Sequence, residues 1–208
     1  MAATNEQIVA FIELVAPLAI AEASRRAAAG EGFVLPSVCI AQAAHETGWG
    51  TSSRMLASNA LFGIKAGGSW QGKVFSADTW EVVEGETHNI TANFRAYDSV
   101  ADSVKDYYDL IANERYREAL STLDAMKTPR ETVTIIWSAG YATDPPYVDL
   151  IMDLLDGRDL DQYDSKVSTS GGSGGSGGSS GSDNDYTYQP PAIPEATFNV
   201  KYFFEKIQ

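Results

Sequence analysis

Residues 39–50, CIAQAAHETGWG, have the pattern of a helix that stops abruptly. Pro36 and Ser37 form a start signal and Gly48 forms a stop signal, so the spacing predicts a helix over roughly Ser37 to Thr47. Its apolar positions recur at helical spacing, and its alanines allow another element to approach closely. Glu46 then lies in the last turn of a helix that faces the core.

That position gives Glu46 a specific chemical character. The C-terminal end of a helix disfavours negative charge, and the apolar surface of Trp49 disfavours it further, so both favour the neutral form of the carboxyl group. A carboxylic acid that stays protonated near neutral pH is what a general acid for glycosidic-bond cleavage needs. The alternative, for a glutamate taken alone, is a solvated residue at a helix end.

Four segments in a fixed order resemble a known family. They are AQAAHETGWG at 41–50, SNALFGIK at 58–65, FRAYDS at 94–99 and AGYATDP at 139–145. Together they resemble glycoside hydrolase family 73, the FlgJ-like and autolysin-like peptidoglycan N-acetylglucosaminidases. The resemblance covers about Asn5 to Asp156. It implies a mainly α, α+β, lysozyme-like fold, with a helical lobe and a small β-hairpin lobe across a substrate cleft.

The resemblance also implies an activity and a set of catalytic residues. The activity is endo-β-N-acetylglucosaminidase cleavage of the β-1,4 bond between N-acetylglucosamine and N-acetylmuramic acid in a peptidoglycan glycan strand, with Glu46 as general acid. The family's second acid lies in a Thr-x-Glu strand, which Thr79-Trp80-Glu81 matches, and Glu84 is the runner-up. The N-acetyl group of the substrate is an alternative nucleophile. Tyr141 matches the family's active-site tyrosine.

The matching segments and their neighbours also supply the expected substrate contacts. Aromatic rings stack on the C–H faces of sugars as they pack on other apolar surfaces. Phe62 and Trp70 are candidates for this role, and for Phe62 a place in the core is an equal alternative. The full expected set is Trp49, Asn59, Phe62, Lys65, Trp70 and Tyr97. His45 departs from the family, whose commonest form has leucine there.

Composition excludes several other classes of function. The 208-residue chain has a net charge of −13, which argues against nucleic acid or an anionic membrane as a partner. A lone cysteine and two histidines argue against a structural zinc site, and no metal or other cofactor is expected. We find neither a run of about 18 apolar residues nor a signal peptide. Peptidoglycan nevertheless places the expected activity in the periplasm or outside the cell.

Hydrophobic periodicity predicts the remaining elements. A first helix begins at a Thr4–Gln7 capping box, is interrupted at Pro17 and ends at Gly30. Alternation over 73–96 predicts a β-hairpin, with a candidate short third strand at 74–75. Three later helices are expected: from Asp98 or Ser99 to Leu123 with an interruption near Asn113, after a Thr128–Glu131 capping box, and from Asp144 to Gly157.

The C-terminal part has a different composition. We predict a hydrolase domain over 1–166, a flexible Gly/Ser linker over 167–182, whose regularity indicates an engineered origin, and an aromatic and proline-rich segment over 183–208. So many aromatic residues in so short a segment cannot fold alone, so we interpret 183–208 as a tethered peptide from a protein partner. Two alternative functions stay open: a lytic transglycosylase, and a lysozyme-like docking module that binds this peptide.

Overall fold

The computed structural model describes residues 2–83 and 86–169, with the side chains of 79–89 excluded. Glu84, most of the linker and the 183–208 segment therefore lie outside the described residues. The helices are α1 (Asn5–Ala28), α2 (Pro36–Thr47), α3 (Ser53–Ser58), α4 (Val100–Ile111), α5 (Pro129–Ser138) and α6 (Tyr147–Asp156), with 3-10 helices η1 (Arg117–Ala119) and η2 (Leu160–Lys166). Strands β1 (Lys73–Val83) and β2 (Glu86–Ala96) form an antiparallel hairpin. The expected mainly helical α+β fold is confirmed.

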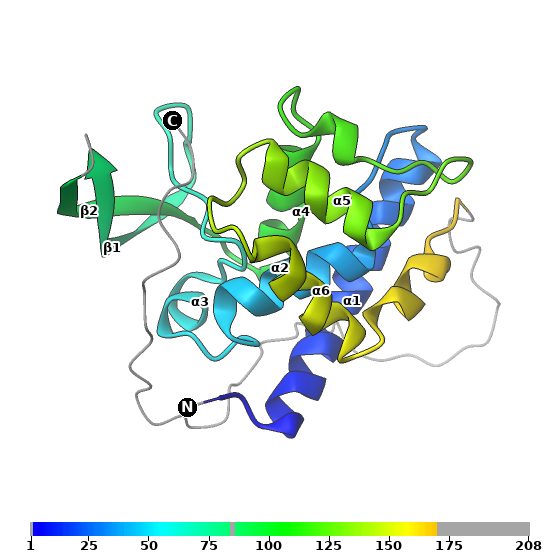
Figure 1. Ribbon diagram of the computed structural model, residues 1–208, viewed down its shortest axis with the longest axis horizontal. Coiled ribbons are helices and arrows are strands. Elements are labelled where there is room, and N and C mark those ends of the chain that lie inside the picture. Colours follow the sequence, from blue (N-terminus) through cyan, green and yellow to red (C-terminus); the bar gives the residue numbers. More distant parts are fainter. Residues whose placement is uncertain (1, 84–85, 170–208) are drawn as a thin grey trace, which may run out of the picture.

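Helix α2 lies in the middle of the helical body (Figure 1). It packs against α1, α5, α6 and η2, and all of its residues except His45 are buried. Its alanines at 41, 43 and 44 are at most 1% exposed, so the surrounding elements approach its backbone closely. The predicted bounds are confirmed to within a residue, and Gly48 ends the helix with a left-handed φ of +57°, which glycine adopts without strain.

The N-terminus of α2 is capped from a distance. The residue at the N-cap, Leu35, provides no side-chain hydrogen bond. Instead Asp164 of η2 accepts hydrogen bonds from the backbone N–H of Ser37 at 2.8 Å and from its hydroxyl at 2.7 Å. A carboxylate here satisfies a donor that the helix leaves open and interacts favourably with the helix dipole. Burial has the larger opposite effect and raises the pKa of Asp164 to about 6.

Helix α1 differs from its prediction at Pro17, where it continues without a break. Pro17 and Glu13 both lie on the exposed face, so the carbonyl group that lacks an amide partner faces solvent. The Thr4–Gln7 capping box and the left-handed Gly30 are as expected. A second difference is that α1 is long and apolar enough, by length and composition, to cross a membrane, although a third of that window is buried inside the domain.

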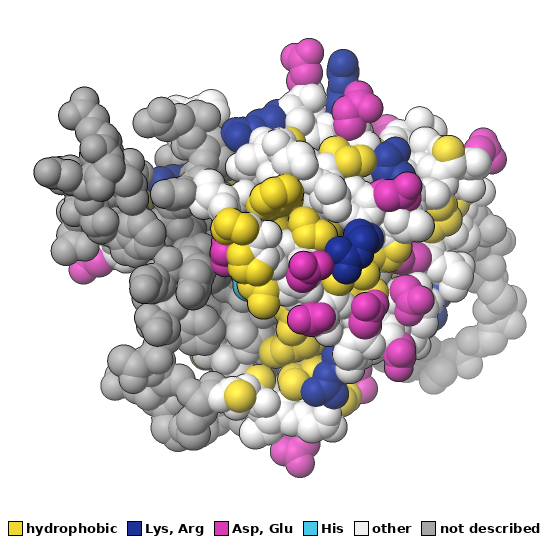
Figure 2. Space-filling view, viewed as in Figure 1, with side chains coloured by type: hydrophobic (Ala, Val, Ile, Leu, Met, Phe, Trp, Pro, Cys, Tyr) yellow, Lys and Arg dark blue, Asp and Glu magenta, His cyan; other side chains and the backbone are white. Residues whose placement is uncertain are grey.

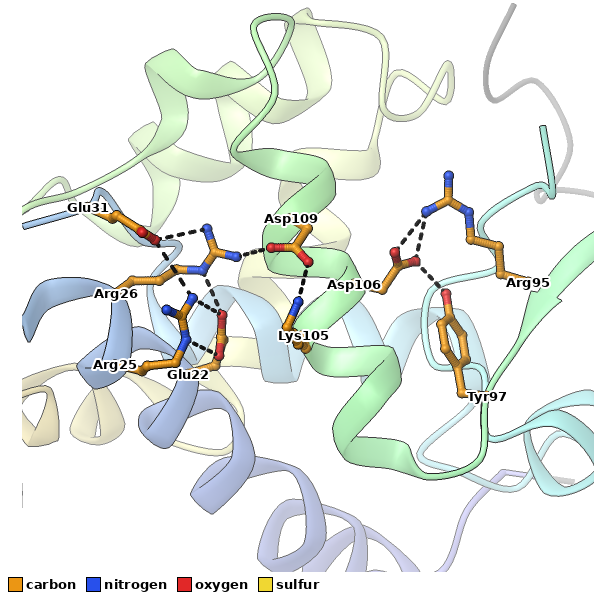
Figure 3. A network of polar contacts seen from close by, with 9 residues as sticks. All are labelled: Glu22, Arg25, Arg26, Glu31, Arg95, Tyr97, Lys105, Asp106 and Asp109. Carbon is orange, nitrogen blue, oxygen red and sulfur yellow. Dashed lines mark hydrogen bonds and ion pairs between the residues drawn. The ribbon is translucent and has the colours of Figure 1, made fainter. Parts of the chain in front are cut away.

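An ion-pair network joins α1 to α4 (Figure 3). Its centre is Arg26, which is only 4% exposed and pairs with Glu22 at 2.8 Å and with Asp109 of α4. A buried guanidinium without such partners would be strongly destabilising, so the network fixes the position of α4 against α1. Arg25 and Lys105 extend the network at the surface.

The hairpin is tied to the helical body by a second polar cluster, also visible in Figure 3. Arg95 of β2 donates two hydrogen bonds of 2.9 Å to Asp106 of α4, and the Tyr97 hydroxyl donates to the same carboxylate at 2.7 Å. The third strand-like segment is not at 74–75, which belongs to β1. It is the bridge between Lys65 and Phe94, where the loop before β1 pairs with β2.

The end of the domain also differs from the sequence prediction. Helix α4 ends at Ile111, next to the interruption expected near Asn113, but the segment from there to Leu123 forms only the short η1 rather than a continued helix. The second capping box, at Thr128, is confirmed. The sequence pattern did not predict η2, whose last turn leads to Val167, a core residue that is 8% exposed.

The raised pKa of Asp164 predicts a specific pH dependence of stability. Because the folded-state value of about 6 lies above the ordinary 3.8, the folded protein binds this proton more tightly than the unfolded chain. This contribution is therefore fully present below about pH 4 and is lost as the pH rises through 6. We expect the free energy of unfolding of wild type to fall, relative to that of Asp164→Asn, by at most about 3 kcal/mol as the pH rises from 4 to 7.5. Urea unfolding of both proteins across this range measures it. Parallel curves for the two proteins would contradict it.

Candidate active site

Glu46 is in the last turn of α2, and its side chain is 9% exposed. The carboxyl group is therefore at the edge of the core rather than on a solvated helix end. Of the elements that bury α2, α6 also lies beside Glu46. Arg54 of α3, Tyr107 of α4 and Tyr141 of the α5–α6 connection complete its surroundings. This position suits a group that exchanges a proton with a bound substrate while bulk water has limited access.

Buried tyrosines form a cluster next to Glu46. The ring of Tyr141 lies 6.5 Å from Tyr107, 6.1 Å from Tyr116 and 6.2 Å from Tyr147, measured between centroids. Burial raises the pKa of Tyr107, Tyr141 and Tyr147 well above its usual range, and the charge of Glu46 raises each of them further. The tyrosines therefore stay neutral and can act only as hydrogen-bond donors or acceptors around the carboxyl group.

Arg54 of α3 is a basic group that interacts electrostatically with Glu46. Its pKa is lowered by burial, and the nearby Glu46 charge acts in the opposite direction. The guanidinium also lies over the ring of Phe94, 4.6 Å from the centroid. Arginine keeps its proton at any physiological pH, so it supplies a constant positive charge at this site.

Sequence reasoning missed Gln42, Arg54, Tyr107 and Tyr147 as site residues. One signal was available in the sequence: Gln42 is a polar residue four positions before Glu46, in a stretch, 38–44, whose other residues are small or apolar. No comparable local signal marks the tyrosines, because their relation to Glu46 arises only when α4 and α6 pack around α2.

The second carboxylate stays a prediction. The backbone of Glu81 lies in β1, where it pairs with His88 of β2, but its side chain is outside the described part of the chain. Glu84 lies entirely outside it. Tyr141, the third predicted catalytic residue, is 2% exposed and follows the left-handed Gly140 that ends the α5 region, close enough to Glu46 to feel its charge.

Two of the aromatic residues predicted to bind sugars are packed against other rings. Phe62 is 2% exposed and stacks on Tyr107 at 4.0 Å, so its faces are taken up within the core. Trp49 is half-buried and meets Phe11 of α1 edge-on at 5.9 Å. The alternative that Phe62 is a core residue therefore fits the structure better than a sugar contact.

The other predicted contacts hold the β-hairpin in place. Asn59 donates hydrogen bonds of 3.1 Å to the carbonyls of Tyr97 and Asp98. Trp70 is half-buried, with its indole N–H bonded to the Lys73 carbonyl and its ring under the Arg95 guanidinium. Tyr97 is buried, and burial together with Asp106 raises its pKa. Lys65 belongs to the segment that pairs with β2.

His45 contacts an aromatic ring rather than a set of metal ligands. Its own ring meets Tyr147 edge-on at 5.6 Å. Within residues 2–83 and 86–169 we find no group of three His, Cys, Asp or Glu side chains that could hold a metal ion.

The described surface has an apolar patch over α5 and α6 (Figure 2) and a separate hollow between α1 and α4. Figure 2 shows apolar side chains gathered over α5 and α6, with acidic side chains around them. A hollow of about 310 Å³ lies elsewhere, between α1 and α4, and is lined by Leu18, Ala21, Glu22, Arg25, Ala101, Asp102, Val104 and Lys105. It contains none of the predicted site residues, so we do not assign the chemistry to it.

Comparison with known proteins agrees with this geometry. The family model described as Glucosaminidase, mannosyl-glycoprotein endo-beta-N-acetylglucosaminidase, matches residues 21–160. The exo-glucosaminidase LytG of Bacillus subtilis is 36% identical over 137 residues, which is 63% of this chain and 46% of LytG. The peptidoglycan hydrolase FlgJ of Vibrio parahaemolyticus is 40% identical over 123 residues, 57% of this chain and 39% of FlgJ. The chain thus spans less than half the length of these relatives.

Solved structures show the same fold. The catalytic domain of the autolysin Auto from Listeria monocytogenes has a TM-score of 0.65 at 29% identity, covering 79% of this chain and 91% of that domain. A peptidoglycan hydrolase from Sphingomonas sp. A1 has a TM-score of 0.58 at 35% identity, covering 80% of this chain and 97% of that one.

Asn59 is predicted to stabilise the fold in two ways, by its hydrogen bonds and by tolerating a left-handed backbone. Substitution by glycine and by alanine distinguishes the two. Asn59 has a φ of +52°, so Asn59→Gly loses two hydrogen bonds but keeps an unstrained backbone, whereas Asn59→Ala adds strain. We expect Asn59→Gly to lower the free energy of unfolding by about 1–2 kcal/mol and Asn59→Ala to cost about 1 kcal/mol more, measured by urea unfolding. A loss of activity with unchanged stability would instead favour a direct substrate contact.

Proposed function

Because this chain belongs to the glucosaminidase family, glycoside hydrolase family 73, we propose that it hydrolyses peptidoglycan with Glu46 as the general acid. The bond cleaved is the β-1,4 bond between N-acetylglucosamine and N-acetylmuramic acid. The observation that carries this proposal is the position of Glu46, 9% exposed at the end of α2, with Tyr141 and Arg54 around it. A partly buried carboxyl group with neutral hydroxyls nearby matches what protonation of a glycosidic oxygen requires.

The reaction needs a second group besides Glu46. In an inverting enzyme a carboxylate activates water from the opposite face of the sugar, and in a retaining enzyme it attacks the anomeric carbon. Glu81 of β1 is our candidate, with Glu84 as runner-up, and the substrate N-acetyl carbonyl can take the nucleophilic role instead. Tyr141 stays neutral and orients either the N-acetyl group or a water molecule by a hydrogen bond.

Peptidoglycan is the proposed partner, and it lies outside the cytoplasm, so the proposed place of action is the periplasm or the cell exterior. A net charge of −13 agrees with a glycan partner better than with nucleic acid or an anionic membrane. A peptide from a protein partner, represented by 183–208, is proposed as a second ligand.

Digestion of purified peptidoglycan tests the role of Glu46. We expect wild type to release fragments with reducing-end N-acetylglucosamine, identified by mass spectrometry, and Glu46→Gln to reduce the rate at least ~100-fold because the amide cannot donate the proton. Glu118→Gln, which removes the same charge from an 81% exposed side chain, should leave the rate unchanged. Anhydro-muramyl ends would assign a lytic transglycosylase instead, and a fully active Glu46→Gln would refute the assignment.

The tail proposal is tested by truncation after Thr169. The cut keeps Val167, which is buried, and the hydrogen bond of 3.2 Å from the Ser168 N–H to the Ser24 hydroxyl. We expect the free 183–208 peptide to bind residues 1–169 in calorimetry with at least micromolar affinity, because a tether works by raising the effective concentration of a ligand that binds on its own. No binding at high micromolar concentration would contradict the tethered-partner proposal.

A further inference from the structure

Gln42 is a fully buried amide one helical turn before Glu46. It is 0% exposed, and residues four apart on a helix lie on the same face, so Gln42 and Glu46 project side by side from α2. The amide bonds to two tyrosines from different helices. The hydroxyl of Tyr107 in α4 donates to Gln42 Oε1, and Gln42 Nε2 donates to the hydroxyl of Tyr147 in α6 at 2.7 Å.

The two bonds give this chain of hydrogen bonds a direction. An amide has a carbonyl end that only accepts and an NH₂ end that only donates. Because Tyr107 donates to the carbonyl end, the NH₂ end of Gln42 must face Tyr147. The Tyr147 oxygen is thereby an acceptor, and its single hydrogen is directed away from Gln42.

Tyr147 lies against the part of α2 that contains Gln42 and His45. It is the first residue of α6, is 2% exposed, and belongs to a helix that packs on α2. Its ring meets His45, the neighbour of Glu46, while its hydroxyl is bonded to Gln42, one turn earlier. Tyr147 therefore spans the stretch of α2 that leads to Glu46. The Glu46 charge is, after burial, the largest influence on the pKa of the hydroxyl.

We propose that Tyr147 is a positioning residue for Glu46, and that the Tyr107–Gln42 hydrogen bond directs the Tyr147 hydroxyl hydrogen toward the Glu46 carboxyl group. A hydrogen bond donated to a carboxylate stabilises its charged form. A hydrogen bond from Tyr147 thus fixes the orientation of the Glu46 carboxyl group and favours its charged form. Its consequence for the rate rests on the proposed function, whereas the hydrogen bond itself does not.

The other groups around Glu46 have roles different from the one proposed for the Tyr147 hydroxyl. Arg54 of α3 is charged throughout the relevant pH range, so it contributes a constant field. The Tyr107 hydroxyl is bonded to Gln42. Tyr141 approaches from the α5–α6 connection and is assigned to the substrate under the proposed function. His45 faces the Tyr147 ring.

The first measurement is the titration of Glu46 without substrate. With ¹³C-labelled glutamate, the Glu46 carboxyl signal is identified by its absence in Glu46→Gln and followed by NMR against pH. We expect Tyr147→Phe to move its midpoint upward by about one pH unit, because the carboxylate loses a stabilising hydrogen bond. The alkaline limb of the peptidoglycan digestion rate should move in the same direction by the same amount.

Two further variants separate positioning from packing. Tyr107→Phe keeps the stack on Phe62 but releases the Gln42 amide, so we expect a smaller upward shift. Tyr116→Phe is the matched control, because its buried hydroxyl lies in the same ring cluster and has no hydrogen-bond partner among the described residues. It should leave the midpoint unchanged.

The outcomes distinguish this inference from the proposed function. An unchanged Glu46 midpoint in folded Tyr147→Phe, or an equal shift in Tyr116→Phe, would overturn the inference. A wild-type protein that does not digest peptidoglycan would overturn the proposed function, while the NMR titration would still decide whether Tyr147 acts on Glu46.

Discussion

The burial of α2 is the constraint on which the rest of this structure depends. A helix that is buried on nearly every side can be accommodated only if its residues are small, its ends are satisfied and its few polar groups find partners. Alanines meet the first requirement, and Asp164 and Gly48 meet the second at opposite ends. The third brings Tyr107 and Tyr147 to Gln42, and so builds the surroundings of Glu46 as a by-product of folding.

The polar groups of this protein differ in charge and in partners according to how deeply they are buried. At the surface, the excess of acidic side chains favours solubility and opposes binding to other anions. At intermediate depth, the ion pair of Arg26 with Asp109 holds α1 against α4, and the ion pair of Asp106 with Arg95 holds the hairpin against α4. Around Gln42, neutral hydroxyls and an amide replace charges altogether. Glu46 is placed at the boundary of this last layer, where its side chain is 9% exposed.

Residues of the family-like segments divide into two groups when their contacts are known. Glu46 and Tyr141 interact electrostatically at the edge of the tyrosine cluster, in agreement with a chemical role. Asn59, Phe62 and Tyr97 instead bond to backbone carbonyls, stack in the core or donate to a carboxylate. A residue of a family-like segment can therefore have a structural role, such as holding the hairpin against the helical body.

The sequence by itself determined the elements whose signals are local. The capping boxes at Thr4 and Thr128, the helix stop at Gly48 and the alternation of the hairpin depend on residues within a few positions of each other, so they were predicted correctly. Only the tertiary structure decided that α1 continues through Pro17, that Asp164 caps a helix 127 residues away and that Gln42 joins two tyrosines beside Glu46. Each of these depends on which face is buried and on groups far apart in the chain, and periodicity contains no information about such partners.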